Sequence, residues 1–140
     1  MLLESDIIIA HMKREDWLKK KATEIFEAIQ DGRLKEIQLS SEVFHELYYV
    51  FSDYAPLSLI LTNEAWLATV KNITFIDPTK EIYLSALDLM ETYHMKSIFD
   101  AIYASTTLSE KTPDHIIVST DDVYGRIKGI QRIDPRELQI

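Results

Sequence analysis

Ile116-Ile117-Val118-Ser119-Thr120-Asp121-Asp122 is an apolar run that passes directly into hydroxyl groups and carboxylates. The run predicts a buried strand from Ile116 to Ser119, with the acids at its carboxyl end. Parallel α/β sheets carry their functional sites at that end of their strands. The stretch therefore predicts a fold class and also the edge of the sheet at which a site would lie.

The rest of the chain alternates strand-like apolar runs with stretches of helical period. Further strands are expected over residues 1–3, 37–39 and 73–76, with an edge strand over 131–133. Helices are expected over residues 16–32, 41–51, 56–71, 79–93, 97–108 and 122–127. This alternation predicts a single domain over residues 1–140 with an α/β fold: a three-layer α/β/α sandwich around a central, mainly parallel sheet of about four to five strands.

Composition restricts the class of protein. With 140 residues and 46% hydrophobic side chains, the chain can build one sizeable core. It contains no cysteine, which excludes a disulfide framework and a thiolate metal site, so any metal must be held by oxygen or imidazole ligands. No membrane span or signal peptide is visible in the sequence, and we expect a soluble, cytoplasmic protein.

The net charge of −8 argues against a broad, nonspecific grip on nucleic acid, which requires clustered lysine and arginine. That total is misleading if most of the acids share one pocket. Bound Mg²⁺ ions would neutralise much of such a pocket, and a phosphate group could then approach.

Further carboxylates come to the same edge of the predicted sheet. Glu4 and Asp6 follow the first strand. Glu42 and Glu46 lie on the helix after the second strand, and Asp100 lies in the first turn of the helix that precedes the fourth. Gathered carboxylates repel one another unless hard divalent cations such as Mg²⁺ or Mn²⁺ hold them together. The pattern therefore indicates a metal-dependent enzyme that cuts phosphodiester bonds.

Each acid taken alone also has a purely structural interpretation. Ser97 and Asp100 match a helix capping box, and so do Ser119 and Asp122. Glu42 fits an exposed acid in the first turn of a helix. Only the joint pattern of acids at one sheet edge favours a metal site over helix capping.

Sequence motifs in a fixed order run through the whole chain. They are Glu4-Ser5-Asp6-Ile7-Ile8-Ile9, Ser41-Glu42-Val43-Phe44-His45-Glu46-Leu47, Phe99-Asp100-Ala101-Ile102-Tyr103-Ala104-Ser105-Thr106, and residues 119–129 with the ending Ile133-Asp134-Pro135. Together they resemble the PIN-domain nucleases, and especially the VapC-like toxins of toxin–antitoxin pairs. The resemblance implies a PIN-like fold and a metal-dependent endoribonuclease that hydrolyses single-stranded RNA.

The resemblance also implies roles for individual residues. The expected catalytic residues are Glu4, Asp6, Glu46, Asp100 and Asp121. The expected ligands of Mg²⁺ or Mn²⁺ are Glu4, Asp6, Asp100, Asp121 and Asp122, although Asp122 has the alternative role of a helix cap. Ser5 and Thr120 are expected to orient these carboxylates. Independently of the resemblance, Arg126 and Lys128 belong to a small basic cluster that follows the acids in the sequence, and they are the expected contacts to RNA phosphate.

Two protein partners are implied in the same way. Family members commonly form homodimers, and an antitoxin protein often covers their site, so both are expected here. The aromatic residues from Tyr48 to Trp66 exceed what one core face of a helical hairpin can hide. This excess is consistent with a partner surface.

Glu4 leaves two other interpretations open. The family normally has Asp at this position, and the extra methylene of Glu carries the carboxylate about 1.5 Å further, which can displace a cation of strict geometry. The chain would then be a weakened or inactive PIN domain acting as a binding or scaffold module. A haloacid-dehalogenase-type phosphatase also has an acid-x-Asp turn after its first strand and a late pair of acids, which Glu4-Ser5-Asp6 and Asp121-Asp122 superficially match. Its chemistry, however, needs an Asp nucleophile in place of Glu4 and a lysine before Asp121.

Overall fold

The core of the fold is a sheet of five strands in which every neighbouring pair is parallel. The computed structural model describes residues 1–140. In spatial order the strands are β3 (Ile73–Ile76), β2 (Ile37–Ser40), β1 (Leu2–Leu3), β4 (Ile116–Val118) and β5 (Gln131–Ile133). The predicted α/β sandwich with a mainly parallel sheet is confirmed, and β5 joins at the edge where the sequence pattern placed it.

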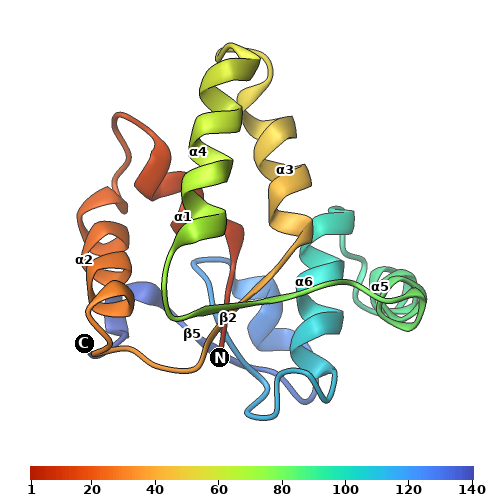
Figure 1. Cartoon of the computed structure of the whole chain (residues 1–140). Coiled ribbons are helices and arrows are strands. Elements are labelled where there is room, and N and C mark those ends of the chain that lie inside the picture. Colours follow the sequence, from red (N-terminus) through yellow and green to blue (C-terminus); the bar gives the residue numbers. More distant parts are fainter.

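Helices connect the strands and cover both faces of the sheet (Figure 1). They are α1 (Ser5–Met12), α2 (Lys19–Gln30), α3 (Glu42–Phe51), α4 (Leu57–Thr69), α5 (Lys80–Tyr93) and α6 (Ile98–Leu108), with short 3₁₀ helices η1 (Asp122–Arg126) and η2 (Pro135–Glu137). The structure adds α1, for which the apolar run 7–10 predicts no definite element. It also begins α2 at Lys19, later than the predicted start at Asp16.

Side chains alternate across the sheet and divide the core into two layers. Leu3 and Val118 pack in the layer under α1, α2, α3 and α4. Leu2 and Ile117, one residue earlier in each strand, pack in the layer under α5, α6 and η1. This is the expected period of two for a strand buried on both faces. In Figure 1, α2 lies on the left of the molecule and α5, seen end-on, lies on the right beside α6.

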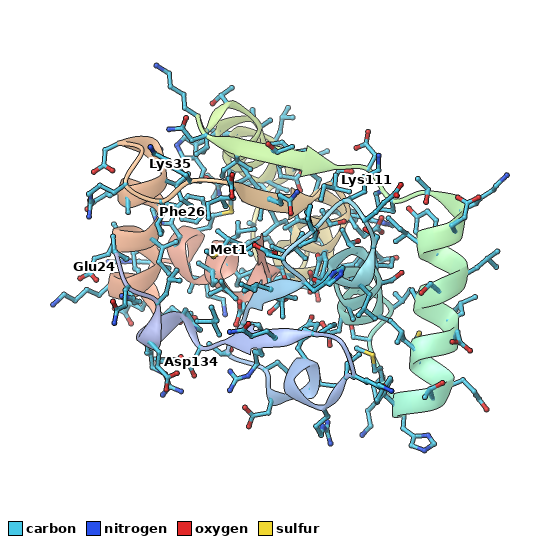
Figure 2. The ribbon with its side chains drawn as sticks, turned by 90° about the horizontal axis from the view of Figure 1, so that it is seen from below. Met1, Glu24, Phe26, Lys35, Lys111 and Asp134 are labelled. Carbon is cyan, nitrogen blue, oxygen red and sulfur yellow. The ribbon has the colours of Figure 1, made fainter.

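The register of the two central strands positions the predicted site. Leu3 of β1 pairs with Val118 of β4, and the backbone N–H of Glu4 donates to the Val118 carbonyl at 3.0 Å. Glu4 is also the single residue between β1 and α1. Strands β1 and β4, which are far apart in the sequence, are therefore brought together and terminate at the same edge of the sheet. Figure 2, seen from below, shows Met1, which directly precedes β1, in the middle of the molecule.

The hairpin of α3 and α4 extends from the rest of the molecule (Figure 1). It carries large exposed side chains, among them Tyr49, Tyr54, Leu57 and Leu61, each at least 60% exposed. Trp66 is different, because its ring stacks on His11 with centroids 5.1 Å apart. The structure therefore leaves several of these aromatic side chains exposed, in agreement with the expectation that one core face cannot hide them all. No helix in the structure is both long enough and apolar enough to cross a membrane.

Replacement of Leu39 by Ala tests the contribution of the sheet core to stability. Leu39 is fully buried in β2, so we expect the free energy of unfolding to fall by about 2 to 5 kcal/mol. Leu61→Ala on α4 is the control, because Leu61 is 66% exposed and its truncation should change stability by less than about 0.5 kcal/mol. Urea unfolding followed by circular dichroism measures both; equal losses would contradict this core.

Candidate functional site

Three carboxylates from distant parts of the chain meet at the carboxyl end of the sheet. Glu4 follows β1, Glu46 projects from α3, and Asp100 lies in the first turn of α6. Each offers an oxygen atom, and these atoms lie within 4.8 Å of one another. The structure thus brings together three of the acids that the sequence assigned to one site.

Glu4 is held in place by two serine hydroxyl groups. Ser5 Oγ donates to Glu4 Oε1 at 2.5 Å, and Ser119 Oγ donates to Glu4 Oε2 at 3.2 Å. The side chain is buried, with only 5% of the residue exposed. Burial, followed by the nearby charge of Asp6, raises the pKa of Glu4 well above its usual range, although the Ser5 hydroxyl partly offsets this. The longer side chain of Glu4 therefore has a defined position.

Asp6 lies beside this cluster and is satisfied on one oxygen only. Its Oδ2 accepts hydrogen bonds from the backbone N–H of Thr120 at 2.7 Å and from Thr120 Oγ1 at 2.5 Å. Its Oδ1 is buried and has no hydrogen-bond partner. A buried carboxylate oxygen without a donor is costly unless a cation or water takes the remaining lone pairs. Thr120 thus contacts a site carboxylate, as expected for an orienting residue.

Glu46 is hydrogen-bonded to a residue that the motif analysis did not single out. The Tyr103 hydroxyl donates to Glu46 Oε2 at 2.5 Å. Burial is the main reason that the pKa of Glu46 is raised, and the Ser5 and Tyr103 hydroxyls counteract it. Tyr103 itself is 1% exposed, and burial, with the charge of Glu46, raises its own pKa so that it remains a donor. The sequence feature that could have identified Tyr103 is its spacing, because it lies three residues after Asp100 and therefore on the same face of the helix.

Asp100 is next to a helix cap without being the capping group. The hydroxyl of Ser97 accepts from the Asp100 backbone N–H at 3.3 Å, as the capping pattern predicts. The Asp100 carboxyl is half-buried, and burial, followed by the charges of Glu46 and Asp121, raises its pKa to about 6. Helix capping and site membership are therefore compatible at this position.

The two acids after β4 have different surroundings. Asp121 caps η1, because its Oδ1 accepts from the Val123 backbone N–H at 2.9 Å, and it remains exposed at the rim near Asp100. Asp122 points away: its side chain is 89% exposed and forms a salt bridge of 2.9 Å with Arg132. The structure does not bring Asp122 to the other acids, and the expected Ser119–Asp122 capping box is wrong because Asp121 is the cap.

Glu42 is also outside the cluster. Its Oε2 accepts from the Tyr83 hydroxyl at 3.0 Å, and its Oε1 lies 3.0 Å from His45 Nδ1. The contact with Tyr83 ties α3 to α5. The residue is half-buried rather than exposed as the sequence suggested.

A groove of about 270 Å³ opens beside the acids. Asp100 and Asp121 line it together with Lys96, His94 and Arg126. Arg126 therefore lines the same groove as two of the predicted site acids. Lys128 is exposed but does not line this groove. Lys96 was not predicted; its place directly before the Ser97 cap was the only signal.

The chemistry of the cluster fits a divalent cation. None of the salt bridges in the structure involves Glu4, Glu46 or Asp100. No lysine or arginine therefore forms an ion pair with any of the three acids. Hard oxygen ligands, with the unpartnered Asp6 Oδ1 beside them, are the donors that Mg²⁺ and Mn²⁺ prefer.

Solved structures of other proteins share this fold. The chain is similar to VapBC2 from Rickettsia felis, solved bound to a DNA fragment from their promoter, with a TM-score of 0.69 and 16% identity over 94% of this chain and 96% of that chain. It is also similar to VapC20 from Mycobacterium tuberculosis, a sarcin-ricin loop cleaving toxin, with a TM-score of 0.71 and 11% identity over 89% and 92% of the two chains. For FitAcB from Neisseria gonorrhoeae the TM-score is 0.63 and the identity 14%, over 98% and 99%.

These identities are low, so the structural similarities demonstrate the fold alone. No curated protein matches the chain by sequence. The model of the PIN domain family, in contrast, matches residues 1–130. Because this match extends from β1 through η1 and includes every element that contributes to the acid cluster, the chain belongs to the PIN-domain family.

Proposed function

We propose that this protein is a metal-dependent endoribonuclease that hydrolyses single-stranded RNA and serves as the toxin of a toxin–antitoxin pair. The observation that carries the proposal is the meeting of Glu4, Glu46 and Asp100 within 4.8 Å, with none of the three in a salt bridge. Membership of the PIN-domain family supports it. The description of VapC20, one of the similar structures, as a cleaving toxin points in the same direction.

The residues that would hold Mg²⁺ or Mn²⁺ are Glu4, Glu46 and Asp100, with Asp6 through its free oxygen and Asp121 at the rim. Asp122 is left out of this set because it pairs with Arg132. When bound, the cation makes a water molecule more acidic and stabilises the charge on the leaving oxygen of the phosphodiester.

The other residues of the site hold the carboxylates or the RNA in position and do not themselves react. Ser5 and Ser119 hold Glu4, and Thr120 holds Asp6 by two hydrogen bonds. Arg126 in the groove contacts an RNA phosphate, and the exposed Lys128 adds positive charge further along the strand. Such contacts place the scissile phosphate against the acids.

The partners of this enzyme would be an antitoxin protein and a second copy of the chain, in the cytoplasm. The exposed aromatic and aliphatic side chains of α3 and α4 support a protein partner. The negative net charge of −8 also favours a localised RNA contact over a broad basic surface.

A binding module without catalytic activity is the second candidate, and one observation favours it. Burial raises the pKa of Glu4, so its carboxyl could stay protonated without metal, and two serine hydroxyls already hold the side chain in place. A phosphatase of the haloacid-dehalogenase type fits less well, because the buried Glu4 replaces the required Asp nucleophile.

Asp100→Asn tests the nuclease directly. Loss of a charged ligand should lower Mn²⁺-dependent cleavage of a mixed-sequence single-stranded RNA by about 100-fold or more. Asp122→Asn is the matched control and should cleave like the wild type, because Asp122 is exposed and outside the cluster. Cleavage is measured on denaturing gels with and without EDTA. Equal activity of wild type and Asp100→Asn would show that the cutting comes from elsewhere.

Glu4→Asp distinguishes an accommodated glutamate from a damaged site. Because Ser5 and Ser119 are placed to bind the longer side chain, we expect the shorter one to lose a hydrogen bond and to reduce cleavage. The same RNA assay measures the change. A large gain in activity would instead identify Glu4 as the residue that weakens this protein.

Removal of metal should make stability depend on pH in a defined direction. A carboxyl whose folded pKa lies above its unfolded value binds its proton more tightly when folded, so stability is lost as the pH rises from the ordinary carboxyl pKa through the folded pKa. For Asp100 the folded pKa is about 6. In EDTA, the urea midpoint should therefore be higher at about pH 5 than at about pH 7.5, and Mn²⁺ should raise it at the higher pH. Asp100→Asn should reduce this dependence; an identical pH profile in the variant would refute the assignment.

A further inference from the structure

We infer that Tyr103 is a positioning residue of this site, and that its hydroxyl holds Glu46 so that the other carboxylate oxygen stays free for the cation. The inference rests on the proposed metal site but adds a residue to it. The direct observation is the hydrogen bond from the Tyr103 hydroxyl to Glu46 Oε2 at 2.5 Å. It joins α6 to α3 across the acid cluster.

Glu46 depends mainly on this donor because the Ser5 hydroxyl, which also lies near it, donates to Glu4 in the structure. A serine hydroxyl has a single proton to donate, and that of Ser5 is directed at Glu4 Oε1. No lysine or arginine forms a salt bridge with Glu46. Without the Tyr103 hydroxyl, the long and flexible Glu46 side chain would lose the hydrogen bond that fixes its rotamer, and Ser5, the other hydroxyl near its buried charge, would still donate to Glu4.

Tyr103 is well suited to fix another side chain. Its ring is 1% exposed and belongs to the core layer under α5 and α6, so the hydroxyl cannot move far. Asp100 precedes it by one turn of the same helix, so that α6 supplies both a ligand and the group that orients a second ligand. The geometry of a site is held more precisely when the side chains that orient its ligands are themselves fixed by packing than when they are free to move.

Tyr124 provides a matched comparison within the same chain. It is fully buried, like Tyr103, and the acids Glu4 and Asp100 lie near enough to raise its pKa after burial itself. Its hydroxyl, however, has no hydrogen-bond partner. Tyr→Phe at the two positions therefore removes the same atom from the same surroundings, and only Tyr103→Phe removes a hydrogen bond to a ligand.

Mn²⁺ binding to the full chain, measured by electron paramagnetic resonance and calorimetry without RNA, tests the inference. We expect Tyr103→Phe to weaken binding by about 10-fold, in the range found for residues that orient metal ligands, and Tyr124→Phe to change it by less than about 2-fold. In a Glu46→Gln background, Tyr103→Phe should cause no further loss, because a residue that acts through Glu46 has nothing left to act on. A merely structural role would give the same loss in both backgrounds.

The outcomes separate the two proposals. Wild type that binds no Mn²⁺ overturns the metal site and this inference with it. Wild-type binding that Tyr103→Phe leaves unchanged, or that Tyr124→Phe weakens equally, overturns the role of Tyr103 alone. If Tyr103→Phe does not fold, as judged by circular dichroism, Glu46→Asp takes its place. The shorter acid moves out of reach of the Tyr103 hydroxyl and should weaken Mn²⁺ binding to a similar extent. Wild-type affinity in that variant overturns the inference.

Discussion

The parallel pairing of β1 with β4 is the constraint on which the rest of this structure depends. It aligns Leu3 with Val118, so both strands end at the same level and Glu4 comes to lie beside Ser119. Parallel neighbours require long crossover connections, and these connections carry the remaining acids: Glu46 enters on α3 and Asp100 on α6. The site is therefore a consequence of sheet topology rather than of any local motif.

Carboxylates gathered at this edge repel one another and so oppose folding. In this structure hydroxyl groups, rather than oppositely charged side chains, form the hydrogen bonds to these acids. Ser5, Ser119, Thr120 and Tyr103 each donate to an acid of the site. A neutral donor satisfies one oxygen and leaves the negative charge in place, whereas a lysine or arginine would neutralise it. Burial, together with the charges of neighbouring acids, raises the pKa values of Glu4, Glu46 and Asp100, and the hydroxyl groups offset this only in part. Such electrostatic strain at a cleft is typical of functional sites.

The sequence predicted most of this arrangement, and its errors have physical causes. The strands and most helices follow from apolar period and turn residues, but the run 7–10 is apolar throughout and shows no period, so helix α1 was not assigned. Asp121 and Asp122 are adjacent acids after one strand, and pattern alone does not say which one turns toward Asp100. The outcome depends on η1, where Asp121 takes the cap position and Asp122 turns out to Arg132.

By itself, the sequence determined the fold class, the edge of the sheet that carries the acids and the family resemblance, because these depend on periodicity and on the order of motifs along the chain. Only the tertiary structure decided which acids meet, since the distance between Glu4, Glu46 and Asp100 depends on how two helices pack against the sheet. It also revealed Tyr103, whose apolar surroundings make it look like an ordinary core residue until α3 brings Glu46 within reach of its hydroxyl. Spacing along one helix can suggest that two residues share a face, but a contact between helices requires their packing in three dimensions.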